Sequence, residues 1–161
     1  VLGLPLSEVR SDVARLKLDK GEQPLPDSSL QTRSGQPLRL VEAGEQALLV
    51  NFWATWCGPC VVELPALETA AARLGERGIL VVLVNVDRGG AEIAQPFLDK
   101  RQINTPLSAY DPDGKWAREL ELRGLPTTLQ IKQGLTGYRF HTGPAEWASP
   151  AILDQVTDYL G

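Results

Sequence analysis

Two cysteines, Cys57 and Cys60, are the residues whose type and spacing predict chemistry most directly. They are the only cysteines among 161 residues, and Gly58 and Pro59 separate them. If this stretch opens a helix, a spacing of three positions places both sulfurs on one face, within reach of a disulfide bond. A dithiol that opens and closes reversibly at the start of a helix predicts a redox centre.

The two sulfurs are expected to have different roles, because only a thiolate attacks a disulfide. At a helix N-terminus, free backbone N–H groups and the positive end of the helix dipole stabilise an anion. Lowering a cysteine pKa from about 8.5 to about 7 corresponds to roughly 2 kcal/mol. Cys57 is therefore predicted to attack, and the more buried Cys60 to resolve the mixed disulfide. Gly58 lets a substrate backbone approach, and Pro59 fits the first turn of the helix.

A purely structural role or a metal-binding role fits the cysteine pair less well. A structural disulfide that closes so short a loop removes little entropy from the unfolded chain. A zinc site needs about four ligands, and the single histidine, His141, lies far from the cysteines in sequence. We therefore predict a site without a metal ion and without a cofactor.

The segments around the cysteines predict a strand–helix–strand unit. Residues 47–53 and 79–86 are apolar runs typical of strands buried on both faces. Residues 59–74 place apolar side chains at helical spacing, and Pro65 is expected to kink that helix. The unit predicts two parallel strands joined by a right-handed crossover.

The rest of the chain predicts one α/β domain with a mixed central β-sheet flanked by helices. His141 is expected at the end of an edge strand. The other predicted elements are a helix over 7–18, a hairpin within 25–40 that turns at Ser34-Gly35, helices over 91–100, 116–122 and 151–160, and strands over 107–110, 127–132 and 137–141.

Composition excludes some partners. The formal net charge is −4, and the basic residues are scattered, so no nucleic-acid partner is expected. No apolar run reaches membrane-spanning length. The chain begins at Val1 and contains no methionine, which suggests a trimmed or processed form from which a signal or anchor has been removed.

Three motifs carry a resemblance to a known family. The segment NFWATWCGPC at 51–60, followed by Glu63-Leu64-Pro65, resembles the active site of the thioredoxin superfamily, and most closely the TlpA branch of periplasmic thiol:disulfide oxidoreductases. GLPTT at 124–128 resembles the family's cis-proline loop, and GPAEWAS at 143–149 resembles TlpA proper. The resemblance implies a thioredoxin-like domain over 25–161, with a helix–strand insertion of the TlpA/ResA type at 89–110. Residues 1–24 would form an N-terminal helix and linker, a possible remnant of a membrane tether.

The resemblance also implies a substrate-binding surface. Pro126 would follow a cis peptide bond and present the Leu125 backbone beside Cys57, where an extended segment of a partner can pair as an added strand. Trp56, directly before the attacking cysteine, would line the same surface, as aromatic residues do at binding sites. The insertion at 89–110 either shapes which protein docks or only elaborates the core.

Asn51 is a departure from ordinary thioredoxins, which carry aspartate at this position. An amide cannot accept the proton of the resolving thiol, so Asn51 could simply be hydrogen-bonded within the sheet. Glu63, one turn after Cys60, is the candidate base and lies where TlpA-like proteins carry a glutamate. The alternative for Glu63 is a solvated carboxylate on the helix face.

The function implied is that of a protein disulfide reductase with protein disulfides as substrates. Similarity to TlpA implies copper-site cysteines of cytochrome oxidase assembly partners, re-reduction by a DsbD/CcdA-like membrane electron donor, and a monomer in the periplasm, anchored to the inner membrane if a segment is missing. The alternatives are haem-site cysteines of apocytochrome c, a disulfide-forming oxidase, and a copper chaperone. The last is disfavoured because Cu(I) prefers sulfur ligands and the chain has no methionine.

Overall fold

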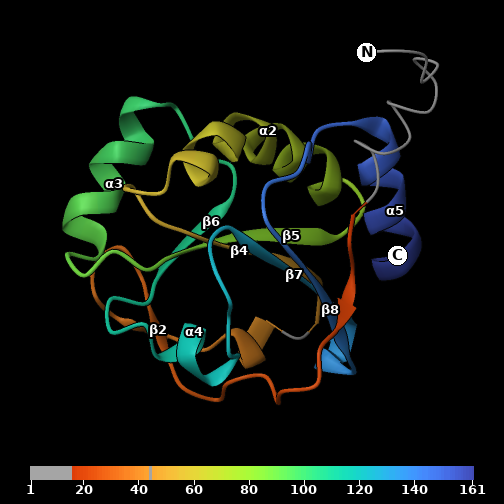
Figure 1. Cartoon of the computed structure of the whole chain (residues 1–161), viewed down its shortest axis with the longest axis horizontal. Helices are drawn as coiled ribbons and strands as arrows, with labels where there is room; N and C mark the ends of the chain where they lie inside the picture. The colour runs from red at the N-terminus through yellow and green to blue at the C-terminus, as the bar shows by residue number, and fades with distance from the viewer. Residues whose placement is uncertain (1–15, 44) are drawn as a thin grey trace, which may run out of the picture.

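An eight-stranded mixed sheet with helices on both faces forms the protein in the computed structural model, which describes residues 16–43 and 45–161 (Figure 1). The strand order is β1-β8-β7-β4-β5-β6-β2-β3. In chain order the elements are β1 (Asp19–Lys20), β2 (Leu30–Gln31), β3 (Pro37–Leu38), the 3₁₀ helix η1 (Leu40–Ala43), β4 (Ala47–Trp53), α2 (Gly58–Gly75), β5 (Ile79–Asn85), α3 (Ala91–Lys100), β6 (Leu107–Tyr110), α4 (Lys115–Glu119), β7 (Thr127–Ile131), the 3₁₀ helix η2 (Gln133–Leu135), β8 (Tyr138–Thr142) and α5 (Pro150–Leu160).

The centre of the sheet is the predicted strand–helix–strand unit. β4 and β5 pair in parallel along their whole length, from Ala47 opposite Ile79 to Trp53 opposite Asn85. β7 pairs with β4 on the other side in antiparallel register. All seven side chains of β4 are buried, because helices or loops cover both faces of the strand.

Alternation along β4 assigns its side chains to the two faces. Leu49 and Trp53 belong to the core beneath α2, α3 and α5, whereas Val50 and Phe52 belong to the opposite core, which α4 and η1 cover. Figure 1 shows α2 and α3 on one side of the sheet and α4 on the other. Asn51, two positions from both Leu49 and Trp53, therefore faces the α2 side.

Most predicted elements are confirmed. The hairpin of β2 and β3 turns at Gly35, whose φ of 83° favours glycine, and α3 and β6 have the predicted bounds. α2 runs without interruption through Pro65, and the kink expected there stays a prediction. Ser149 caps α5 by accepting a hydrogen bond from the backbone N–H of Ile152 at 3.3 Å, as its position before Pro150 predicts.

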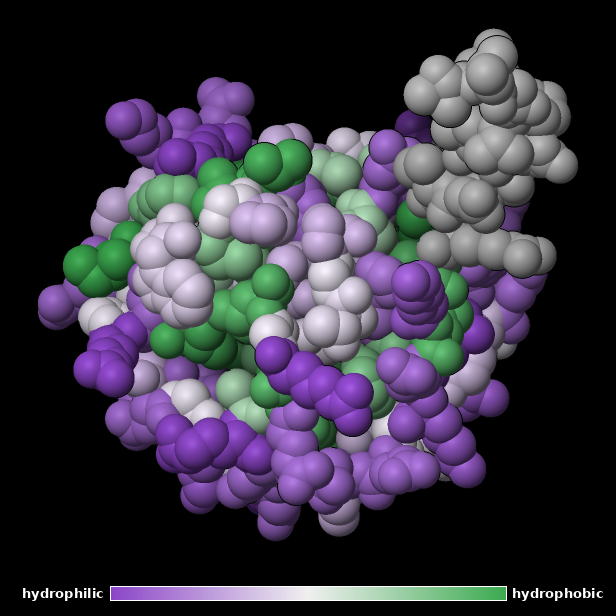
Figure 2. All heavy atoms as spheres, viewed as in Figure 1, coloured by the Kyte–Doolittle hydropathy of each residue, from purple (hydrophilic) through white to green (hydrophobic). Residues whose placement is uncertain are grey.

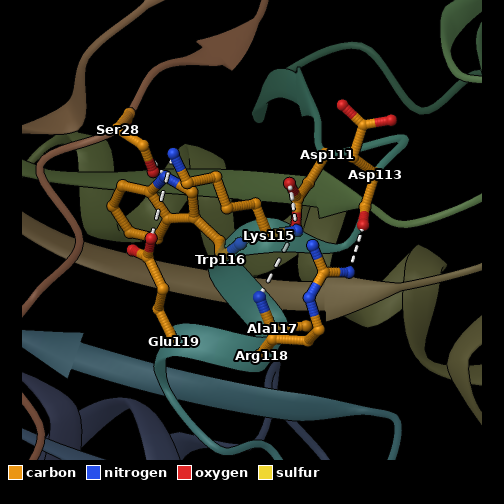
Figure 3. Close-up of polar contacts among 8 residues, drawn as sticks. All are labelled: Ser28, Asp111, Asp113, Lys115, Trp116, Ala117, Arg118 and Glu119. Carbon is orange, nitrogen blue, oxygen red and sulfur yellow. Dashed lines mark hydrogen bonds and ion pairs between the residues drawn. The ribbon is translucent and has the colours of Figure 1, made fainter.

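The helix before residue 127 is shorter than predicted. α4 ends at Glu119 rather than at Leu122, because Glu121 takes a left-handed conformation with φ of 54°. The buried carboxylate of Asp111 fixes the start of α4, because it accepts hydrogen bonds from the backbone N–H groups of residues 115, 116 and 117 at 3.1, 3.1 and 3.4 Å (Figure 3). The indole of Trp116 donates to the Ser28 carbonyl at 2.9 Å and ties α4 to the segment before β2.

Two predictions near the ends of the sheet are corrected. The helix expected over 7–18 lies mostly outside the described residues, and residues 16–18 are not helical. They lead into β1, which pairs with β8 at Asp19 opposite Phe140. β8 is therefore an inner strand and not an edge strand, so the predicted edge position of His141 is wrong. The boundary expected between residues 24 and 25 stays a prediction.

Candidate active site

The two cysteines form a disulfide at the N-terminus of α2. Cys57 is the N-cap residue, and its Sγ accepts a hydrogen bond from the backbone N–H of Cys60 at 3.3 Å. The Cα atoms of the two cysteines are 5.3 Å apart. Cys57 is 7% exposed and Cys60 is fully buried. The order of exposure agrees with an attacking Cys57 and a resolving Cys60, although Cys57 is less open than the sequence suggests.

Exposed residues surround the buried sulfurs. Gly58 and Pro59 are exposed, and Trp56 is 70% exposed. Val62, one turn further along α2, is 79% exposed. On the face seen in Figure 2, hydrophobic and near-neutral side chains gather in the middle and hydrophilic ones lie along the lower rim. Large apolar side chains at the surface are typical of protein-binding sites.

The loop before β7 has the cis-proline geometry that the family resemblance implies. The peptide bond between Leu125 and Pro126 is cis. Leu125 is half-buried and packs against the core cluster that contains Cys57 and Cys60. The Pro126 carbonyl accepts a hydrogen bond from the backbone N–H of Gly143 at 2.8 Å. The cis-proline loop is thereby joined to the segment that follows β8.

A row of polar side chains crosses the sheet beneath α2. Asn51 in β4 is opposite Thr128 in β7, and Thr128 is opposite His141 in β8. Directly paired residues point to the same face of a sheet, so all three belong to the α2 side. The Asn51 amide donates to Thr128 Oγ1 at 2.9 Å. Asn51 is thus hydrogen-bonded in the sheet, as its buried polar side chain suggests.

Glu63 lies over this row and is 4% exposed. Its Oε1 accepts a hydrogen bond from Asn51 Nδ2 at 2.9 Å. Its Oε2 accepts two more, from the backbone N–H of Ala145 at 3.1 Å and from Trp147 Nε1 at 3.0 Å. The alternative of a solvated carboxylate on the helix face is therefore wrong. The sequence did not predict these partners, because they lie on other elements.

Burial controls the ionisation of Glu63. Removal of the carboxylate from water raises its pKa above the ordinary value of 4.5. The hydrogen bonds from Ala145, Asn51 and Trp147 and the charge of His141 act in the opposite direction, but burial outweighs them. A carboxyl group with a raised pKa is better matched to proton exchange with a thiol than an ordinary glutamate.

An open groove gives solvent a path to Glu63. It has a volume of about 530 Å³ and lies between α2 and the segment after β8. Its lining is mainly apolar, and Glu63, Glu146 and Ser149 are the polar residues among those that line it. A proton can therefore reach the carboxyl group without passing through the core.

His141 supports the segment that holds Glu63. It is 8% exposed, and its Nε2 lies 3.2 Å from the Pro144 carbonyl oxygen. Its Nδ1 lies 3.2 Å from both the backbone nitrogen and the carbonyl oxygen of Lys17. Its ring meets Trp147 edge to face, with centroids 6.2 Å apart. His141, to which the sequence assigns no task, thus anchors the residues that donate to Glu63.

Asp87 is a site residue that the sequence motifs did not reveal. It follows β5, is 6% exposed, and accepts hydrogen bonds from the Thr55 backbone N–H at 2.8 Å and hydroxyl at 2.7 Å. The Asn85 amide donates to it at 2.7 Å. Thr55 lies two residues before Cys57, so Asp87 fixes the turn that presents the dithiol. An acidic residue directly after a buried strand was the signal available.

The described part of the chain offers neither a metal-binding cluster nor a membrane-spanning helix. Within 16–43 and 45–161, no three or more His, Cys, Asp and Glu side chains are placed to bind a metal ion. In the same ranges, no helix has the length and hydrophobicity needed to cross a membrane.

Comparison with known proteins gives concordant matches. The model of the AhpC/TSA family matches residues 22–135. The chain is 43% identical over 128 residues to the thioredoxin-like protein YneN of Bacillus subtilis, covering 78% of this chain and 73% of that protein. It is 30% identical over 95 residues to the thiol-disulfide oxidoreductase ResA of Oceanobacillus iheyensis, covering 59% of this chain. That match spans about half (48%) of the ResA protein.

A solved structure shares the architecture. The crystal structure of a Chlorobium tepidum protein described as thiol:disulfide interchange protein DsbE superposes with a TM-score of 0.74 at 30% sequence identity. The superposition covers 90% of this chain and all of the other one.

Proposed function

The chain belongs to the thioredoxin superfamily and, within it, to the TlpA-like thiol:disulfide oxidoreductases, and from this premise we propose that it is a protein disulfide reductase. The observation that carries the proposal is the hydrogen bond from the Cys60 backbone N–H to Cys57 Sγ at the start of α2. The same N–H and the helix dipole would stabilise a Cys57 thiolate once the disulfide is reduced.

The reaction proceeds by two exchanges. The Cys57 thiolate attacks one sulfur of a substrate disulfide, and a mixed disulfide forms while the other substrate sulfur leaves as a thiolate. Cys60 then loses its proton and attacks Cys57 Sγ, which releases the second substrate sulfur. The two substrate thiolates take up protons. The substrate gains two electrons, and Cys57 and Cys60 end as the disulfide seen in the structure.

Glu63 is proposed to accept the proton of Cys60. It lies three residues later on α2, so the two side chains share one face of the helix. Its raised pKa reduces the mismatch with a thiol, whose ordinary pKa is about 8.5. Glu63 then releases the proton to solvent through the groove that it lines.

Leu125 and Pro126 are proposed to bind the substrate together with Trp56, Gly58 and Pro59. The half-buried Leu125 packs against the cluster that contains the dithiol. Its backbone would pair with an extended segment of the substrate beside Cys57. The exposed Trp56 would contribute apolar contact area to the same complex.

The proposed substrates are oxidised copper-site cysteines of cytochrome oxidase assembly partners in the periplasm. Similarity to TlpA supports them, together with a DsbD/CcdA-like membrane electron donor and a monomeric protein that an N-terminal segment anchors. Haem-site cysteines of apocytochrome c are the competing substrate class.

Trapping tests both parts of this proposal. The Cys60→Ser variant cannot resolve the mixed disulfide, so a substrate stays covalently attached to Cys57. Incubation of the reduced wild type with each oxidised candidate, followed by thiol counting, should give two new substrate thiols per reaction. If neither class gains thiols, the substrate assignment is wrong. If Cys60→Ser traps no protein at all, the reductase proposal itself fails.

A further inference from the structure

The surroundings of Glu63 determine where a proton on this residue must lie. Oε2 faces two N–H groups, the backbone of Ala145 and the indole of Trp147, and neither can accept a hydrogen bond. A proton on Oε2 would point at one of these donors. A proton taken up by Glu63 therefore belongs on Oε1.

Oε1 faces Asn51, whose Nδ2 is also a donor. In the structure this nitrogen donates to Glu63 Oε1 and to Thr128 Oγ1, both at 2.9 Å. Asn51 Oδ1, in contrast, is one of four buried side-chain polar atoms in the described part of the chain that have no hydrogen-bond partner. This arrangement suits an ionised Glu63, because a protonated Oε1 would place its O–H against the amide N–H.

We propose that the side-chain amide of Asn51 turns over when Glu63 is protonated, so that Oδ1 and Nδ2 exchange positions. This inference rests on the proposed role of Glu63 as the proton acceptor. Oδ1 then accepts the proton of Glu63 Oε1. The main chain of Asn51 stays fixed, because β4 is paired with both β5 and β7 at this residue. Asn51 is thus a positioning residue that offers Glu63 a hydrogen bond in both protonation states.

Thr128 makes the reversal possible. Its hydroxyl accepts from Asn51 Nδ2 when Glu63 is ionised and can rotate to donate to Oδ1 when Glu63 is neutral. The unpartnered atom changes from Oδ1 to Nδ2, and both N–H groups of Nδ2 then lose their acceptors. An aspartate at position 51 could not do this without a second titration.

The other groups near Glu63 do not provide an alternative partner. Among the titratable residues around it, His141 interacts through its charge and uses its ring nitrogens on Pro144 and Lys17. Glu146 lines the same groove and is exposed. Cys60 lies on the same helix and is held in the disulfide.

The experiment is an NMR titration of the oxidised wild-type protein, in which neither cysteine ionises. The chain contains three asparagines, at 51, 85 and 104, and nine glutamines, so the Asn51 side-chain amide is first assigned among twelve such groups. The carboxyl carbon of Glu63 reports its protonation. As Glu63 becomes protonated, both Nδ2 protons of Asn51 should shift upfield together, because each loses its acceptor.

The proton that faces Thr128 decides the result. Thr128 does not titrate, so this proton should move with Glu63 only if the amide reverses. If the signal of the Glu63 carboxyl carbon shifts with pH while the signal of this Asn51 amide proton stays unchanged, the inference is overturned and the proposed function is left intact. A Glu63 carbon that never titrates overturns both the inference and the proposed role of Glu63.

Glu63→Gln supplies a matched control. The Oε1 atom of the introduced glutamine can accept hydrogen bonds from Ala145 and Trp147. Its amide N–H group then faces Asn51, and Asn51 must turn its Oδ1 atom toward position 63 to accept this hydrogen bond. This variant should show the shifted Asn51 signals at every pH. If it does not fold, the wild-type titration still decides the question. Shifted signals that follow pH in this variant would overturn the inference.

Discussion

At the scale of single residues, the site depends on a carboxyl group held by neutral donors. Glu63 is almost completely buried and receives three hydrogen bonds, none of them from a cation. Burial penalises the charged form, whereas the three donors favour it. The balance leaves the pKa raised, and each donor can therefore be tested by removing it.

Trp147→Phe removes one donor and retains an aromatic ring. The ionised form of Glu63 loses a hydrogen bond to a charged group, worth about 1.5–3 kcal/mol, so its pKa should rise by about 1–2 pH units. Titration of the Glu63 carboxyl carbon measures the change. Trp116→Phe is the matched control, because that buried indole donates to the Ser28 carbonyl on the other side of the sheet. Equal shifts in both variants would contradict the assignment.

The raised pKa of Glu63 also makes stability depend on pH. The folded protein binds this proton more tightly than the unfolded chain does, so the contribution of Glu63 to the free energy of unfolding is greatest below the unfolded pKa of about 4.5. It should fall as the pH rises through the folded pKa. Glu63→Gln lacks this titration, so its stability relative to wild type should increase as the pH rises above about 4.5 and through the raised pKa of the folded state.

Urea unfolding of both proteins across this range measures the difference. The comparison cancels the titrations that the two proteins share. A stability difference that is independent of pH would show that Glu63 has the same proton affinity in the folded and unfolded states.

At the scale of elements, the active-site turn depends on the end of the neighbouring strand. Asp87, which follows β5, lies beside the turn between β4 and α2 and accepts two hydrogen bonds from Thr55. Parallel pairing of β4 and β5 places both strand ends at the same edge of the sheet. The carboxylate therefore holds the residues directly before Cys57 in one conformation.

Asp87→Asn and Asp87→Ala separate geometry from charge. The Oδ1 atom of asparagine can accept from the Thr55 and Asn85 N–H groups, and its amide can donate to the Thr55 hydroxyl, so Asp87→Asn should keep all three contacts. Asp87→Ala leaves these donors without an acceptor and should cost about 1–3 kcal/mol per unsatisfied group. Urea unfolding and the alkylation rate of reduced Cys57 measure the two effects. Equal behaviour of both variants would exclude a positioning role.

A comparison of the predicted and observed elements shows which parts of the structure the sequence could predict. The bounds of β4, α3 and β6 follow from apolar runs and helical spacing, which are local signals. The partners of Glu63 are not local: Ala145 and Trp147 lie more than eighty residues later. β1 has only two residues, too few for any alternation to show. Motifs thus identified the dithiol, whereas its hydrogen-bond network required the tertiary structure.

At the scale of the whole molecule, the segment before the predicted domain boundary is part of the sheet. β1 covers the outer side of β8, and the Gly21 backbone N–H donates to the Tyr138 carbonyl at 3.0 Å. The Tyr138 hydroxyl donates in return to the Gln23 carbonyl at 2.7 Å. Lys17 reaches His141, which supports the segment that binds Glu63. Residues 17–23 are therefore connected to the active site through β8 and His141.

Gly21→Ala tests whether this attachment matters. The added Cβ would lie 2.1 Å from the ring of the buried Tyr138, so β1 and β8 must separate or the ring must move. Such overpacking should cost about 1–3 kcal/mol of stability, measured by urea unfolding. Gly137→Ala is the matched control, because its Cβ would have no neighbour within 4 Å. Equal stability of the two variants would show that residues 16–24 act only as a linker.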